Sequence, residues 1–206
     1  MKNMEKETIC NNANAIFDRL LNAYSCMSAF KSIKSVYDRH EEYLFLSGTN
    51  FWRMVTDNCI FRTLVELSKI YDEGKDAVGL KKLINQVEQS KTEFENAELV
   101  HTAKEKYAAL SNSKEKLKTL RDKGLVHSDK EYMADPKQLI SEYAPSLPEI
   151  YALLNTAAEI CNDILVEYTG ERRSVTRVLF EDASGVISDL KLAYEAKKKR
   201  FKKSMQ

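Results

Sequence analysis

An arginine and a histidine separated by five residues are the side chains in this sequence whose types and spacing could do chemistry. They are Arg121 and His127. A histidine titrates near neutral pH and can move a proton, while a guanidinium can bind a phosphate through two donors. Asp122 directly follows the arginine and could hold either side chain in place. We therefore interpret these three residues as a candidate site for metal-free RNA cleavage.

Each of these residues also has a simpler structural use. Arg121 could neutralise the negative end of a helix, or pair with Asp122 or a nearby glutamate. His127 could be a surface histidine bonded to a backbone carbonyl after a helix end. Asp129 is expected to cap the helix that follows. We expect the other two histidines, His40 and His101, to be structural or solvent-facing.

The elements that would position this site follow from apolar residues three and four positions apart, a spacing typical of α-helices. The pattern predicts an all-α protein, an up-and-down helical bundle with additional short helices. We expect one domain over residues 1–206, with a core at about 50–170 and with the first helix and the basic C-terminal helix packed on it. The helices are expected at about residues 5–47, 50–71, 80–87, 92–120, 132–143, 148–168 and 182–201.

Arg121 has an unusual position in this pattern. The apolar stripe of the helix expected at 92–120 runs to Leu117, and four residues further it reaches Arg121. A charged side chain near the inward face of a helix needs a partner, an interface or a ligand. Gly124 then stops the helix, although a distorted turn could continue toward His127.

Composition excludes several classes of protein. A formal net charge of +1 is unlike that of histone-type or repressor-type nucleic-acid binders, although lysines and arginines gather in some segments. The four cysteines are widely spaced, so we expect them to be reduced core residues. No apolar stretch is long enough to span a bilayer or to form a signal core. We expect a cytoplasmic protein with no membrane association.

The stretch from Leu120 to Asp129 resembles the HEPN superfamily (higher-eukaryote and prokaryote nucleotide-binding domain), and specifically its abortive-infection-associated bacterial branch. The segment from Leu64 to Asp72, followed by Leu80 to Ile84, is similar to a helix-and-turn pattern of the same branch. The resemblance covers roughly residues 51–168. Asp122 matches the polar residue that this family carries after the arginine.

The resemblance implies a homodimer in which two copies of the dyad face a shared cleft. It also implies a metal-independent endoribonuclease that leaves 2′,3′-cyclic phosphate ends, acting as a toxin or antiphage effector restrained by an antitoxin or a sensor protein. No glycine-rich nucleotide loop or metal-ligand motif is present, so neither a cofactor nor a metal is expected. The candidate RNA contacts are Lys123, Ser128 and Lys130. The alternative is a non-catalytic helical scaffold that acts through protein or nucleotide contacts.

Overall fold

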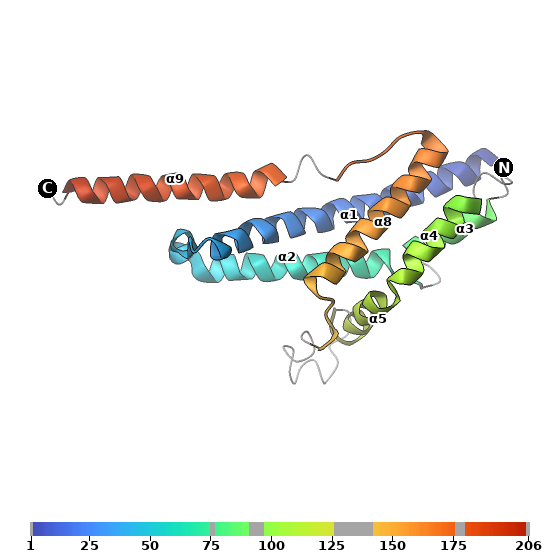
Figure 1. The fold of residues 1–206 in the computed structure, drawn as a ribbon, viewed down its shortest axis with the longest axis horizontal. Helices are drawn as coiled ribbons and strands as arrows, with labels where there is room; N and C mark the ends of the chain where they lie inside the picture. The colour runs from blue at the N-terminus through green and yellow to red at the C-terminus, as the bar shows by residue number, and fades with distance from the viewer. Residues whose placement is uncertain (1, 75–76, 91–96, 126–141, 176–179, 205–206) are drawn as a thin grey trace. The chain divides into compact units, whose positions relative to one another are not determined.

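The computed structural model describes residues 2–74, 77–90, 97–125, 142–175 and 180–204, and these residues form helices and connecting turns with no strand among them (Figure 1). The all-α prediction is confirmed. The chain forms two compact units. Unit 1 consists of Met1–Ala23 and Leu64–Arg173, and unit 2 consists of Tyr24–Thr63 and Ser174–Gln206. That residues 1–206 form a single domain stays a prediction. The helices, with the short turns η1 and η2, are α1 (Lys2–Asp38), η1 (Glu42–Gly48), α2 (Thr49–Ile70), α3 (Leu80–Gln89), α4 (Ala97–Ala109), α5 (Ser111–Leu120), η2 (Arg121–Leu125), α8 (Leu147–Thr169) and α9 (Phe180–Ser204).

The first helix ends earlier than its apolar pattern predicts. We expected it to reach Ser47, but α1 stops at Asp38 because His40 takes a left-handed conformation with φ of 54°. The amide of His40 donates to the Tyr37 carbonyl, and that of Glu41 donates to the Val36 carbonyl. This pair of bonds is the Schellman arrangement, which usually has a glycine where His40 stands. The chain continues as the 3₁₀ turn η1.

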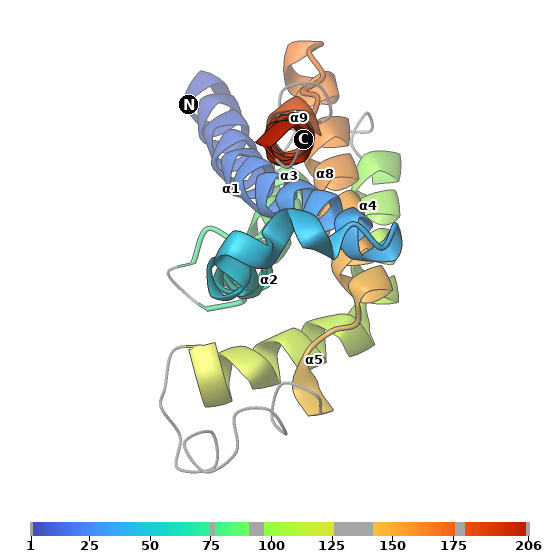
Figure 2. The same cartoon turned by 90° about the vertical axis from the view of Figure 1, so that its left-hand side faces the viewer.

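The helix expected at 92–120 is also interrupted. Within its described part, α4 ends at Ala109 and α5 begins at Ser111, with Leu110 between them at φ of −92° and ψ of 12°. The Leu110 carbonyl accepts the amide of Lys114, so Leu110 starts a new helix. In Figure 2, α5 points away from the direction of α4. This bend carries the end of α5, and with it Arg121, away from the axis of α4.

The unit that contains Arg121 has a core built from one face of each helix. Residues of α1, α3 and α8 that the periodicity placed inside are buried: Ile9, Ala13, Ile16, Leu20, Leu80, Leu83, Ile84, Val87, Ile150, Leu153, Leu154, Ala157, Ile160, Cys161, Ile164 and Leu165. In this unit α4 packs against α3 and α8, and α5 packs against α8. Leu117 and Leu120 are 1% and 2% exposed, so α5 is anchored on its inner side just before Arg121.

Unit 2 has a smaller core of its own. It consists of Ile33, Val36, Leu44, Phe45 and Ile187. The first part of α2 leaves large apolar side chains outside this core, since Phe51, Met54 and Phe61 are 54%, 54% and 48% exposed. Of the cysteines, Cys59 and Cys161 are buried, Cys10 and Cys26 are half-buried, and all four are free. None of the helices in the described ranges is both long and apolar enough to cross a membrane.

Helix α8 begins and ends where its sequence predicts. Ser146 and Glu149 form a capping box at its start, and Gly170 closes it with φ of 73°. The Glu149 carboxylate also accepts Lys116 Nζ of α5, at 2.8 and 3.0 Å. The Lys116 ammonium, followed by the amide and hydroxyl of Ser146, lowers the pKa of Glu149 to about 2. One carboxylate therefore ties α5 to the start of α8.

This contact predicts a pH-dependent stability. The folded pKa of Glu149 lies below its unfolded value, so its contribution is complete above about pH 4.5 and is lost as the pH falls toward 2. We expect Glu149→Gln to lower the free energy of unfolding in urea by about 1 kcal/mol at pH 7 and to cost much less at pH 3. Glu167→Gln, on the exposed side of α8, is the control. Equal losses at both pH values would contradict the assignment.

Candidate active site around Arg121

Arg121 lies at the point where α5 changes into a wider helical turn. Its amide donates to the carbonyls of Leu117 and Lys118, and the chain then forms the single π-helical turn η2. Such turns are rare and occur often at functional sites. Gly124 does not stop the helical turn as expected, and the alternative, a distorted turn that continues toward His127, is confirmed as far as Leu125. This turn presents Arg121 at the end of a helix that is anchored by buried leucines.

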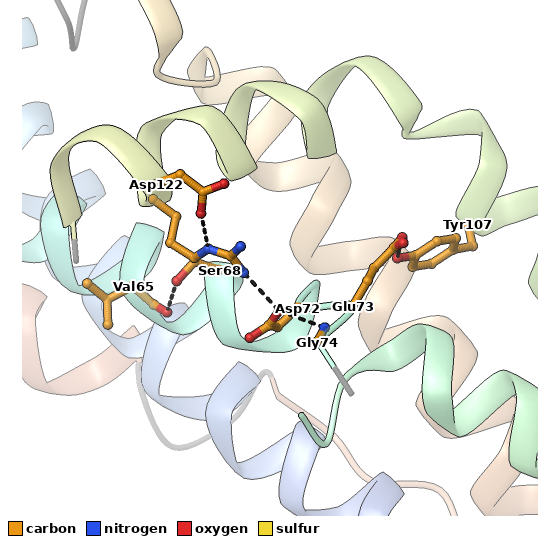
Figure 3. A network of polar contacts seen from close by, with 8 residues as sticks. Val65, Ser68, Asp72, Glu73, Gly74, Tyr107 and Asp122 are labelled. Atoms are coloured by element: carbon orange, nitrogen blue, oxygen red, sulfur yellow. Dashed lines mark hydrogen bonds and ion pairs between the residues drawn. The ribbon is translucent and has the colours of Figure 1, made fainter. Parts of the chain in front are cut away.

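Two carboxylates hold the guanidinium of Arg121. Its Nε donates to Asp122 Oδ1 at 2.8 Å, and its Nη1 donates to Asp72 Oδ1 at 2.8 Å. Figure 3 shows both interactions as dashed lines, with Asp122 on the helical turn that follows α5 and Asp72 after the end of α2. Burial lowers the pKa of Arg121, but the bonds to Asp122 and then Asp72 outweigh it and raise the pKa above its usual value. The guanidinium is charged and fixed in direction.

Asp72 is the member of this group that sequence reasoning missed. It lies in the turn after α2, where its Oδ1 also accepts the amide of Gly74 at 3.0 Å. Residues 72–74 are not helical and lie just after α2, and residues 75 and 76 lie outside the described ranges. Arg121 was expected to need a partner, but nothing in the spacing of two residues 49 positions apart indicates that they meet.

A second polar group lies beside the first. Glu73 accepts Lys81 Nζ at 2.6 Å and the Tyr107 hydroxyl at 2.8 Å. The bond from Lys81 is the main cause of a lowered pKa of Glu73, while burial and then Glu73 raise the pKa of Tyr107. Lys114 Nζ lies 3.3 Å from the centre of the Tyr107 ring. Tyr71 stacks on Tyr107 with the ring centres 5.9 Å apart. Glu73 and Tyr107 are thus fixed by contacts of their own.

A pocket of about 570 Å³ lies between these groups. It is lined by the end of α2, the turn after it and one face of α5. This volume falls in the range of small-molecule sites, so a nucleotide fits it by size. Hydroxyl, carboxylate and ammonium groups share its lining, which consists of Ser68, Tyr71, Asp72, Glu73, Gly74, Ser111, Lys114, Glu115, Leu117, Lys118 and Arg121.

The structure brings together only part of the predicted site. Arg121 and Asp122 are in direct contact. Lys123 Nζ lies 4.8 Å from the centre of the Tyr143 ring, a cation–π contact within the same unit. Among the described residues, no group of three histidines, cysteines or carboxylates is arranged to hold a metal ion. Three other predicted site residues lie outside the described residues: His127, Ser128 and Lys130. The expected capping residue Asp129 lies outside them as well.

Neither of the two remaining histidines lines the pocket. His40 is exposed at the end of α1, and His101 is exposed on α4, with its Nδ1 3.5 Å from Glu105. Both agree with the structural or solvent-facing role expected of them. Among the described residues that line the pocket, the cationic side chains are Arg121, Lys114 and Lys118.

Comparison with known proteins identifies one family. The model of the family HEPN_AbiU2, described as AbiU2, matches residues 6–185. The match covers both segments on which the resemblance to HEPN proteins was based. No curated protein and no solved structure matches the chain.

Proposed function

We propose, from the premise that this chain belongs to the AbiU2 family of HEPN proteins, that it is an endoribonuclease of abortive infection. One observation carries the proposal. The arginine of the family-like motif ends a well-anchored helix, is oriented by two carboxylates and lines a nucleotide-sized pocket. This is a prepared cationic donor of the kind that phosphoryl transfer requires.

Arg121 would stabilise the negative charge that develops on the phosphate. Its Nε and Nη1 are used by Asp122 and Asp72, and Nη2 makes no hydrogen bond within the described ranges. A fork fixed through two of its nitrogens can direct the third at a phosphate oxygen without losing further side-chain entropy. Asp122, which the sequence suggested could hold either side chain of the dyad in place, would act as an orienting group for Arg121.

His127 would transfer the protons. In the proposed reaction the ribose 2′-oxygen forms a bond to phosphorus while the bond from phosphorus to the 5′-oxygen breaks. One base takes the proton of the 2′-hydroxyl, and one acid gives a proton to the departing 5′-oxygen. A single chain offers one His127, so a homodimer with two facing sites would supply both groups. The products are a 2′,3′-cyclic phosphate and a 5′-hydroxyl, and no step needs a metal.

Such an activity would have to be restrained in the cell. We propose that an antitoxin or a sensor protein keeps the enzyme inactive until a signal such as phage infection, and that cellular or phage RNA is then the substrate. The family to which the chain belongs supports this role.

The test is the chemistry of the cleaved ends. Purified protein is incubated with a mixed-sequence RNA in excess chelator, and the ends are mapped with enzymes that distinguish cyclic phosphates from 3′-hydroxyls. We expect 2′,3′-cyclic phosphate and 5′-hydroxyl ends, and none with His127→Ala prepared in the same way. Intact RNA at all protein concentrations would favour the non-catalytic scaffold.

A further inference from the structure

We infer that Lys114 and Lys118 form a phosphate track along α5 that guides the backbone of single-stranded RNA to Arg121. This inference rests on the proposed function, because Arg121 is the end of the track. It assigns RNA binding to the face of α5 that lines the pocket. The contacts first expected, Lys123, Ser128 and Lys130, lie further along the chain.

The first argument is the spacing of the three cations. Lys114, Lys118 and Arg121 stand at positions i, i+4 and i+7, so they lie on one face of the helix. All three line the same pocket. With a rise of 1.5 Å per residue, the steps along the axis are about 6 Å and about 4.5 Å. Long lysine side chains at these intervals can reach consecutive phosphates of one strand.

The second argument is that the acidic groups nearest to Arg121 and Lys114 are already used. Asp72 is bound to Arg121, and Glu73 accepts Lys81 and the Tyr107 hydroxyl. Within the described chain, neither Lys114 nor Lys118 forms an ion pair. Lys114 instead lies over the Tyr107 ring, and its burial lowers the pKa of its ammonium. Glu73 acts on Lys114 through its charge but makes no ion-pair contact with it, so this half-buried cation gains from a bound phosphate.

The same helix provides a contrast. Lys116 lies on another face of α5, where Glu149 of α8 neutralises it at 2.8 Å. Lys116 therefore has the same charge and nearly the same position in the sequence, but a partner of its own. One unfavourable group remains in the pocket, because Glu115 also contributes to the lining. Its carboxylate should repel a phosphate, so its removal should strengthen binding.

The experiment measures binding of the full chain to a 2′-O-methyl RNA, which cannot be cleaved because its 2′-oxygen is blocked. Fluorescence anisotropy gives the dissociation constant at several salt concentrations. We expect Lys114→Ala and Lys118→Ala each to weaken binding about fivefold and to reduce the slope of log K against log salt by about 0.7. Lys116→Ala is expected to leave the slope unchanged, and Glu115→Gln to tighten binding. Urea unfolding checks that each variant is folded.

Two results would overturn the track. The first is a salt slope that stays at the wild-type value in Lys114→Ala and Lys118→Ala, or one that Lys116→Ala reduces as much as these two variants do. The other is the absence of any salt-dependent binding by the wild-type protein. The outcome is separate from that of the cleavage assay. If RNA binding depends on the two lysines but the protein cleaves no RNA, the ribonuclease proposal is wrong and the phosphate track stands. If the protein cleaves RNA but the lysine variants leave the salt slope unchanged, the phosphate track is wrong and the ribonuclease proposal stands.

Discussion

Replacing Arg121 with alanine is expected to lower kcat/KM for RNA cleavage by about a thousandfold. The substitution removes the one guanidinium among the described residues of the pocket lining, and it leaves Asp72 and Asp122 facing a phosphate without a counter-charge. Arg121→Lys should recover only a small part of the activity, because an ammonium cannot make both carboxylate bonds and still present a fork to the substrate. Initial rates with a fluorescent RNA in excess chelator measure the effect.

A double substitution tests whether Arg121 acts together with His127. Each alanine variant alone should lose most of the activity, and Arg121→Ala combined with His127→Ala should be little worse than either, because residues that act as a unit are not additive. Circular dichroism and urea unfolding serve as controls for folding. Losses that simply multiply would mean that the two side chains contribute independently, and an active Arg121→Ala variant would contradict the assignment of the site.

Most helices could be predicted because their signals are local. For α8, the expected start at Pro148 and Glu149 and the end at Gly170 agree with the structure. The capping box at the start and the left-handed glycine at the end each depend on a few residues close together in the sequence. The four apolar residues of α3 are likewise all buried: Leu80, Leu83, Ile84 and Val87. In these segments, local preference and tertiary burial favour the same structure.

The two wrong helix boundaries share a different cause. His40 closes α1 with a positive φ at a position where glycine is usual, and Leu110 separates α4 from α5 without a glycine or proline nearby. Neither residue type predicts a break. The bonds that close α1 and begin α5 join backbone groups, which carry no residue signature, so periodicity alone extended each helix too far.

The candidate site shows the same limit. The position of Arg121 on the extended apolar stripe correctly indicated that it needs a partner, and Asp122 was available beside it. Asp72 could not be identified, because it reaches Arg121 only after α3 and α4 have returned the chain to the end of α2. The lysines of the pocket were visible as a basic segment, and their spacing places them on one helix face, but the sequence does not show that this face lines a pocket with the end of α2.

Asp72→Ala is the substitution that tests the geometry around Arg121 most directly. Asp72 has two opposed effects: it orients the guanidinium, and its charge opposes an incoming phosphate. Misplacing a catalytic group by about 1 Å can lower the rate about a hundredfold. One charge about 4 Å from the phosphate in water changes the binding free energy by about 1 kcal/mol, or the affinity about fivefold. Orientation should therefore dominate, and we expect kcat to fall about a hundredfold while KM stays equal or decreases.

Asp72→Asn separates the two effects. The amide oxygen can still accept Arg121 Nη1 and the amide of Gly74, so the guanidinium stays oriented while the charge is lost. We expect kcat to fall less than about tenfold. Asp163→Ala, which removes the 3.1 Å ion pair with Lys106 outside the pocket, should leave both constants unchanged. A kcat unaffected by Asp72→Ala, or a loss seen only in KM, would show that Asp122 alone orients the arginine, because only a displaced guanidinium slows the chemical step at saturating RNA.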